Sequence, residues 1–93
     1  MSFELEFLPS ALKEWKKLDG TIRQQFRSKL AERLENPFVA PDKLSGHAQR
    51  YKIKLRSLGY RLVYEVVNER IVLLVVAVGK REKNEIYDVA AKR

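Results

Sequence analysis

Apolar and polar residues alternate at the start of the chain. Phe3, Leu5 and Phe7 are separated each time by a glutamate, and this period of two is typical of a strand with one buried face. Pro9 ends the pattern, because proline cannot donate a backbone hydrogen bond. We therefore predict a strand over residues 2–7.

Two segments with helical spacing follow. The first has apolar residues on one helical face, namely Ala11, Leu12, Trp15 and Leu18. Asp19-Gly20 predicts its end, since glycine adopts a positive φ freely. The second begins at Thr21, with Gln24 three residues later, which is the pattern of a capping box. Its apolar residues recur every four positions before Asn36-Pro37: Ile22, Phe26, Leu30 and Leu34. We predict a helix over each segment.

The second half of the chain predicts three strands and a helix. Residues 37–50 contain two prolines and a glycine without a sustained period, and predict a loop. Strands are expected over residues 51–56, 60–67 and 71–78, and the last is apolar throughout, as in a strand buried on both faces. Residues 82–91 have a weak helical pattern.

The order strand, helix, helix, three strands, helix predicts an α+β fold. We expect one domain, residues 1–93, with a mostly antiparallel four-stranded sheet, two N-terminal helices and a short C-terminal helix. The three consecutive strands form a meander. The order alone leaves the neighbour of the first strand open.

The first hairpin decides where Arg61 lies. A two-residue turn or a four-residue loop after the strand at 51–56 places Lys52, Lys54 and Arg61 on the same face. A three-residue loop without a bulge would place Arg61 in the core, where an unpaired guanidinium is very costly. We therefore expect the three cations to share one surface.

The positive charge of the chain is concentrated in its second half. Nineteen Lys and Arg against twelve Asp and Glu give a net charge of +7 over 93 residues. Residues 1–46 contribute +1 and residues 47–93 contribute +6, and residues 50–61 hold five cations and no acid. This local excess favours a polyanion as partner, first of all nucleic acid. The alternative is a solvated strand face that discourages edge pairing.

Several classes of chemistry are excluded or disfavoured. The chain has no cysteine, so it has no disulfide, thiolate catalysis or sulfur-bound zinc. Its one histidine, His47, lies in the predicted loop, where we expect an ordinary solvated side chain. The acids are scattered, so we predict no metal and no cofactor. With neither an export signal nor a bilayer-length apolar run, we expect a cytoplasmic chain that does not contact membrane.

RNA cleavage by the neighbouring 2′-hydroxyl fits the residues that remain. The reaction needs a proton acceptor, cations to stabilise the phosphorane and a donor for the leaving oxygen. Nearby positive charges favour the neutral form of lysine, so Lys52 and Lys54 beside Arg56 and Arg61 can include a base. Among the tyrosines we expect Tyr87 to be exposed and functional, and three to fill the core: Tyr51, Tyr60 and Tyr64.

Four segments resemble the RelE family: ALKEWKKL at 11–18, KLSG at 43–46, YKIKLRSLGYRLVYEV at 51–66 and VGKREKNEIY at 78–87. The resemblance runs in matching order through nearly the whole chain. RelE proteins are toxins of bacterial toxin–antitoxin modules, with this same order of elements, and they cut mRNA in the ribosomal A site. The resemblance therefore implies a metal-independent mRNA endonuclease that depends on the ribosome and inhibits translation.

The resemblance also assigns roles to single residues. It implies that Lys52 accepts the proton, that Lys54 supports the phosphate charge and that Arg61 stabilises the phosphorane. Arg81 would contact the scissile phosphate and assist the leaving group, and Tyr87 would orient the substrate.

Further RNA contacts are expected from four cations: Arg50, Arg56, Lys80 and Lys83. Ser45 stands where the family carries an arginine, which removes one expected contact and predicts slower cleavage unless Arg50 substitutes.

The resemblance implies partners as well. They are the ribosome, at its A site and small-subunit RNA, its mRNA, and an acidic RelB-like antitoxin that wraps the toxin, displaces its C-terminal helix and blocks the basic face. We expect operator DNA to be contacted only through the antitoxin, with this chain at most a corepressor. Two alternatives are a noncatalytic RNA-binding module, with salt-sensitive binding, and a RelE-like inhibitor of another target.

Overall fold

The computed structural model describes residues 2–46, 49–80, 82 and 85–93. The predicted order of elements is confirmed: β1 (Glu4–Phe7), α1 (Pro9–Lys16), α2 (Gly20–Glu35), β2 (Arg50–Leu55), β3 (Tyr60–Val67), β4 (Val72–Lys80) and α3 (Glu85–Ala91). Two 3₁₀ turns lie between them, η1 (Ala40–Asp42) and η2 (Asn68–Arg70).

The four strands form one mixed sheet in the order β1-β4-β3-β2. β2, β3 and β4 make the predicted antiparallel meander, and β1 lies parallel to β4. β4 therefore has a strand on each side, and most of it is buried, which confirms the prediction of a strand with two buried faces. β2 is an edge strand of the sheet.

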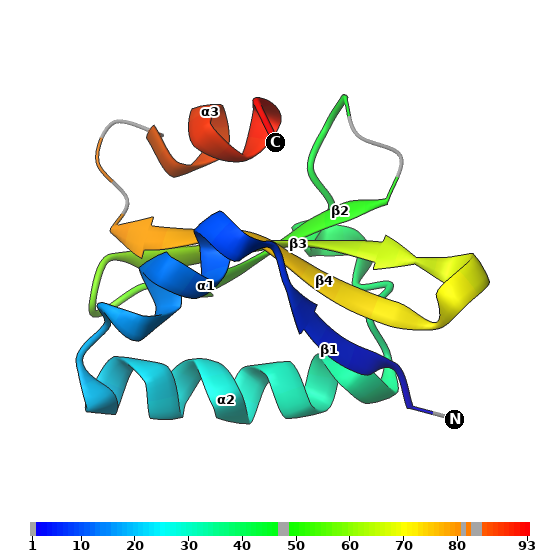
Figure 1. Ribbon diagram of the computed structural model, residues 1–93, viewed down its shortest axis with the longest axis horizontal. Helices are drawn as coiled ribbons and strands as arrows, with labels where there is room; N and C mark the ends of the chain where they lie inside the picture. The colour runs from blue at the N-terminus through cyan, green and yellow to red at the C-terminus, as the bar shows by residue number, and fades with distance from the viewer. Residues whose placement is uncertain (1, 47–48, 81, 83–84) are drawn as a thin grey trace.

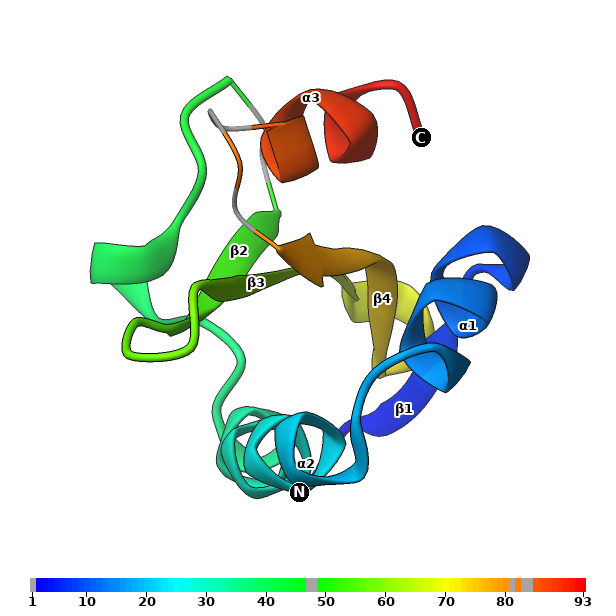
Figure 2. The same cartoon turned by 90° about the vertical axis from the view of Figure 1, so that its left-hand side faces the viewer.

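Helices cover both faces of the sheet (Figures 1 and 2). α2 runs along one face, over a core that includes Phe26, Leu30, Ile53 and Tyr64. α3 covers the other face over a smaller cluster of Val63, Val76, Ala77, Ile86 and Ala90. α1 lies beside β1 and β4 (Figure 2). Within the described residues, no helix is long and apolar enough to cross a membrane.

A bulge in β4 allows the smaller cluster to form. Val63 pairs with Ala77 and Tyr64 pairs with Val75, so Val76 is an extra residue on β4. An extra residue twists the strand locally, and here Val76 and Ala77 both pack into the cluster beneath α3.

The predicted start of α2 is wrong. α2 begins at Gly20, and its N-cap is Asp19, whose carboxylate accepts the N–H of Thr21 at 3.0 Å. Gly20 is therefore helical rather than a positive-φ end to α1, which finishes at Lys16. Aspartate is at least as good an N-cap as threonine, and capping at Asp19 lets the helix include two more residues.

Other boundaries differ by one to three residues. β2 is Arg50–Leu55 rather than 51–56, and β4 continues to Lys80 rather than ending at 78. β1 begins at Glu4 because the N–H of Phe3 bonds to the carbonyl of Leu34, at the end of α2, at 2.8 Å. β4 begins at Val72 because Ile71 has a φ of 53°. α3 is assigned from Glu85 rather than residue 82.

Candidate active site

The alternation along β2 sends its cations and its apolar side chains to opposite faces. Tyr51, Ile53 and Leu55 are buried in the main core, and Lys52 and Lys54 are half-buried on the other face. The prediction of one core face and one cationic face is confirmed. The core role predicted for the tyrosines is confirmed too, since Tyr51 stacks on Tyr64 with ring centroids 5.6 Å apart.

The hairpin between β2 and β3 adds Arg61 to the lysine face. Leu55 pairs with Tyr60 and Lys54 with Arg61 across a four-residue loop, one of the two predicted geometries. Gly59 ends the loop with a φ of 72°, a conformation that L side chains rarely adopt. Directly opposed residues share a face, so Lys52, Lys54 and Arg61 lie on one side of the sheet.

The burial of Arg61 differs from the exposed position that was expected. Only 7% of the residue is exposed, and one of its terminal nitrogens, Nη1, donates to the carbonyl of Tyr60 at 2.8 Å. Its Nε has no hydrogen-bond partner among the residues that the structure describes. The lysine face is thus not open throughout, because α3 covers the part formed by β3 and β4. A buried guanidinium with an unpaired donor is a ready partner for an anion.

The surrounding positive charges lower the pKa of Lys54. The charge of Lys52 is the largest cause, followed by partial burial and the charges of Arg56 and Arg61, while Asp42 opposes the shift. Each positive neighbour makes a second charge on the face less favourable. The face therefore favours release of a proton from the Lys54 ammonium group.

α3 places Tyr87 on the same side of the sheet. Tyr87 is half-buried rather than exposed as predicted, because it packs at the edge of the smaller cluster, beside the buried Ile86. Ile86 lies over Gly79, since a Cβ at Gly79 would be 3.7 Å from Ile86 Cδ1, and Gly79 is the neighbour of Arg61 on β4. The first turn of α3 thus brings the predicted tyrosine to the side of the sheet that carries the cations.

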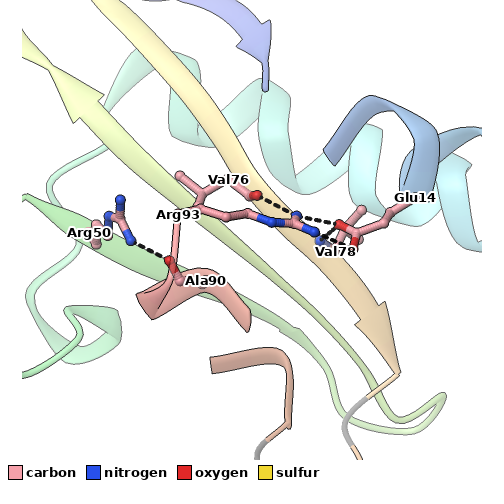
Figure 3. A network of polar contacts seen from close by, with 6 residues as sticks. All are labelled: Glu14, Arg50, Val76, Val78, Ala90 and Arg93. Atoms are coloured by element: carbon pink, nitrogen blue, oxygen red, sulfur yellow. Dashed lines mark hydrogen bonds and ion pairs between the residues drawn. The ribbon is translucent and has the colours of Figure 1, made fainter. Parts of the chain in front are cut away.

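Arg50 holds α3 to the sheet. Its guanidinium donates to the Ala90 carbonyl through Nη1 at 2.7 Å (Figure 3). It also pairs through Nε with Glu65 at 2.9 Å. A cation at the C-terminal end of a helix also interacts favourably with its free carbonyls. The predicted RNA contact of Arg50 remains a prediction, and two of its donors are already engaged.

A second anchor joins α1, β4 and the C-terminus. Beyond Val75, β1 no longer pairs with β4. Glu14 and Arg93 take its place: Glu14 accepts the Val78 N–H at 3.2 Å, and Arg93 donates to the Val76 carbonyl at 2.9 Å. The two side chains also pair through both carboxylate oxygens, at 2.9 and 3.0 Å (Figure 3). Backbone groups of a strand edge are thus satisfied by side chains.

A third set of polar contacts lies behind β2, and the sequence analysis did not predict it. Arg33 of α2 bonds to the Tyr64 hydroxyl at 2.8 Å and to the Asp42 carboxylate at 2.6 Å. The signal for it in the sequence is a charged residue on the buried face of a helix, three positions after Leu30. A cation at such a position is seldom buried without partners.

The remaining predicted residues are only partly placed. Lys80 is exposed at the end of β4 and Arg56 is exposed in the hairpin loop. Arg81, Lys83 and His47 lie outside the described residues. Among the residues described, no group of three or more His, Asp or Glu comes together as a candidate metal site.

The chain matches the family model described as the ParE toxin of type II toxin–antitoxin systems over residues 5–85. It is 53% identical over 93 residues to the mRNA interferase toxin RelE of Escherichia coli (strain K12), covering 100% of this chain and 98% of that protein. The mRNA interferase RelE of Shigella flexneri matches with the same identity and coverage.

Solved structures agree with these sequence matches. A variant of E. coli toxin RelE in the free state superposes with a TM-score of 0.92 at 52% identity, over 100% of this chain and 98% of that one. RelE in the intact E. coli RelBE toxin–antitoxin complex gives 0.84 at 52% identity, over 87% and 99%. By sequence and by fold, as the quoted segments predicted, this chain belongs to the RelE family of toxins.

Proposed function

We propose that this chain is a ribosome-dependent mRNA endonuclease, a toxin that cuts mRNA in the ribosomal A site and so inhibits translation. The observation that carries the proposal is the face shared by Lys52, Lys54 and Arg61, on which the pKa of Lys54 is lowered. The relatives named mRNA interferase support it across the full length of the chain.

The proposed reaction is attack by the RNA on itself. The 2′-oxygen forms a bond to the adjacent phosphorus while the bond from phosphorus to the 5′-oxygen breaks, which leaves a 2′,3′-cyclic phosphate and a 5′-hydroxyl. The 2′-hydroxyl proton passes to Lys52, which we keep as the acceptor, and the leaving 5′-oxygen takes up a proton from water. The charge of Lys52 is the largest cause of the lowered pKa of Lys54, so loss of one proton from this pair of lysines relieves the repulsion between them.

Charge stabilisation is assigned to the arginines. Arg61 is held in place by the Tyr60 carbonyl and has an unpaired Nε, so its guanidinium needs little reorganisation to meet the phosphorane. We assign Arg81 to the scissile phosphate and the leaving oxygen, and Tyr87 to the orientation of the substrate. No cofactor takes part in this scheme.

The proposal explains why the ribosome is needed. This face offers amines and guanidinium groups but no histidine or carboxylate positioned as an acid–base pair among the described residues. Such a site depends strongly on a substrate that is already oriented for in-line attack. A ribosome that holds mRNA in a strained geometry supplies that orientation, and its location places the chain in the cytoplasm.

We propose a RelB-like antitoxin as the neutralising partner. E. coli RelE, at 52% identity, was crystallised as a complex with its RelB antitoxin. The net charge of +7 favours an acidic partner on electrostatic grounds. If the antitoxin displaces α3, as we expect, it must break the contacts of Arg50 with Ala90 and of Arg93 with Glu14. Operator DNA is then reached only through the antitoxin.

Mapping mRNA ends by primer extension tests the activity. The protein is added to programmed ribosomes and to free mRNA, beside Lys52→Ala and Arg81→Ala variants and the exposed-cation control Lys92→Ala. We expect cuts within A-site codons, only on ribosomes, lost in the first two variants and kept in the control. Intact mRNA with salt-sensitive RNA binding would replace the proposal with a noncatalytic binding module. Growth arrest without cleavage would point to another target.

A further inference from the structure

Arg33 connects four segments behind the edge strand β2. From α2, its Nη1 donates to the Tyr64 hydroxyl of β3 at 2.8 Å and to the Lys52 carbonyl of β2 at 3.3 Å. Its Nη2 pairs with the Asp42 carboxylate of η1 at 2.6 Å. The Tyr64 hydroxyl in turn donates to the Pro37 carbonyl at 2.8 Å, so the loop before β2 is tied to the same guanidinium.

The contact with Lys52 holds the backbone that carries the lysine pair. β2 pairs with β3 on one side only, so the backbone groups on its free edge need other partners. On that edge the Arg50 carbonyl accepts from the N–H of Leu44, and the Lys52 carbonyl accepts from Arg33. The orientation of the peptide that follows Lys52 therefore depends on a side chain of α2.

The contact between Arg33 and Asp42 also affects Lys54. Among the described residues, Asp42 is the one acid that raises the pKa of Lys54. Lys54 is surrounded by Lys52 and Arg56 on its own hairpin, by Arg61 on β3 and by Asp42 on η1. Only 15% of the Arg33 side chain and 27% of the Asp42 side chain are exposed. Their pairing holds the carboxylate on the Arg33 guanidinium, whose positive charge limits how far Asp42 offsets the charges of the lysines.

We propose that Arg33 is a positioning residue for mRNA cleavage, which orients the Lys52 peptide and keeps the Asp42 carboxylate paired behind the cationic face. This inference rests on the proposed function. The ion pair between Arg33 and Asp42 has a second effect. Arg33 offsets the negative charge of Asp42 without adding a hydrogen-bonding group to the face that meets RNA.

The burial and bonding of Arg33 agree with a fixed, permanently charged group. Burial alone would lower the pKa of Arg33, but the hydrogen bonds and charges of Tyr64 and Asp42 outweigh it and raise the pKa. The guanidinium also lies 5.8 Å from the centroid of the Tyr64 ring, within reach of a cation–π interaction. Lysine at this position would supply a charge but not the forked geometry that reaches three acceptors.

Two substitutions with opposite effects test the proposal. Arg33→Met frees the Asp42 carboxylate, so the titration of the Lys54 amine, followed by NMR of labelled lysine, moves to higher pH. Asp42→Asn removes the negative charge, so the same titration moves to lower pH. The double variant brings it back toward the wild-type value or below. Arg27→Met, an equal loss of charge on the exposed face of α2, controls for net charge.

Single-turnover cleavage on programmed ribosomes supplies the second measurement. Arg33→Met is expected to lower the rate at neutral pH about tenfold to a hundredfold, to move the rising limb of the pH–rate profile to higher pH, and to leave ribosome affinity unchanged. The double variant restores the position of the limb but not the full rate, because the Lys52 peptide stays unsupported. Arg33→Lys is expected to keep the wild-type position of the limb but not the full rate.

The results separate this inference from the proposed function. If the wild-type protein does not cleave, the proposed function fails, whereas the NMR titrations still report on Arg33. If it cleaves and the Lys54 titration is the same in all variants, the inference is overturned. Should Arg33→Met fail to fold, as circular dichroism would reveal, Asp42→Asn decides alone: an unshifted Lys54 titration and pH–rate profile would refute the proposal.

Discussion

Glu14→Ala is expected to destabilise the fold well beyond the usual effect of a surface substitution. The carboxylate accepts from the N–H of the buried Val78 at 3.2 Å and from Nη1 and Nη2 of Arg93 at 2.9 and 3.0 Å. Leaving a buried backbone donor without a partner costs about 1–3 kcal/mol. Loss of the ion pair, whose side chains are 30% and 22% exposed, adds about 1 kcal/mol.

The sum is about 3 kcal/mol, or roughly 12–24 °C in Tm for a domain of this size. Urea unfolding followed by circular dichroism measures it. Glu14→Gln is the matched control, since the amide oxygen still accepts from Val78 and only the charge is lost, at a cost of about 1 kcal/mol. Arg93→Ala removes the ion pair and the bond to the Val76 carbonyl, and should cost about 1–2 kcal/mol.

A double-mutant cycle tests whether the two side chains act together. The double variant Glu14→Ala/Arg93→Ala should lose at least about 0.5 kcal/mol less stability than the sum of the losses in the two single variants, as for residues in one network. Equal costs for Glu14→Ala and Glu14→Gln would refute the role given to the Val78 N–H. Strict additivity would refute the view that the pair substitutes for a strand beyond the end of β1.

Three further predictions concern single side chains. Arg56→Gln removes a charge that lowers the pKa of Lys54, so that pKa rises and the rising limb of the pH–rate profile for cleavage moves to higher pH; an unmoved limb would contradict this. Arg61→Met should raise the free energy of unfolding by about 1–3 kcal/mol, because a buried guanidinium with an unpaired Nε is lost. Cleavage should fall at least about a hundredfold. A lower free energy of unfolding in urea would contradict this prediction. Tyr64→Phe leaves Arg33 and the Pro37 carbonyl without a shared partner and should cost about 1–3 kcal/mol in the same assay. Burial raises the pKa of Tyr64 even though Arg33 lowers it. The stability contributed by the neutral hydroxyl is therefore complete below the pKa of the unfolded state, and it is lost as pH rises through the pKa of the folded state. Tyr64→Phe should thus lose less stability than wild type as the solution becomes alkaline.

Local patterns predicted the elements well and their ends less well. The alternation around Lys52 and the four-residue repeat from Ile22 to Leu34 each describe a chain with one buried side, which is a property of neighbouring residues. The start of α2 was mistaken because Asp19 and Thr21 both suit an N-cap. The start of β1 was mistaken because the N–H of Phe3 bonds to Leu34, far along the chain.

The candidate site was also predicted only in part, as far as short-range patterns allow. That Lys52, Lys54 and Arg61 share a face follows from alternation and hairpin register, both of which are short-range. Neither pattern indicates that Arg61 is buried, because its burial depends on α3 packing across β3 and β4. Nor does either indicate that Arg50 holds α3, since its partner Ala90 is forty positions away.

By itself, then, the sequence determined the order of elements, the face of β2 that carries the lysines, the family and the excess of positive charge. Tertiary structure alone decided the parallel pairing of β1 with β4, the burial of Arg61, the substitution of Glu14 and Arg93 for a missing strand, and the contacts of Arg33 behind the lysines. The physical reason is that hydrogen-bonding groups must be satisfied when they are buried, and which groups become buried is known only once distant segments have packed together.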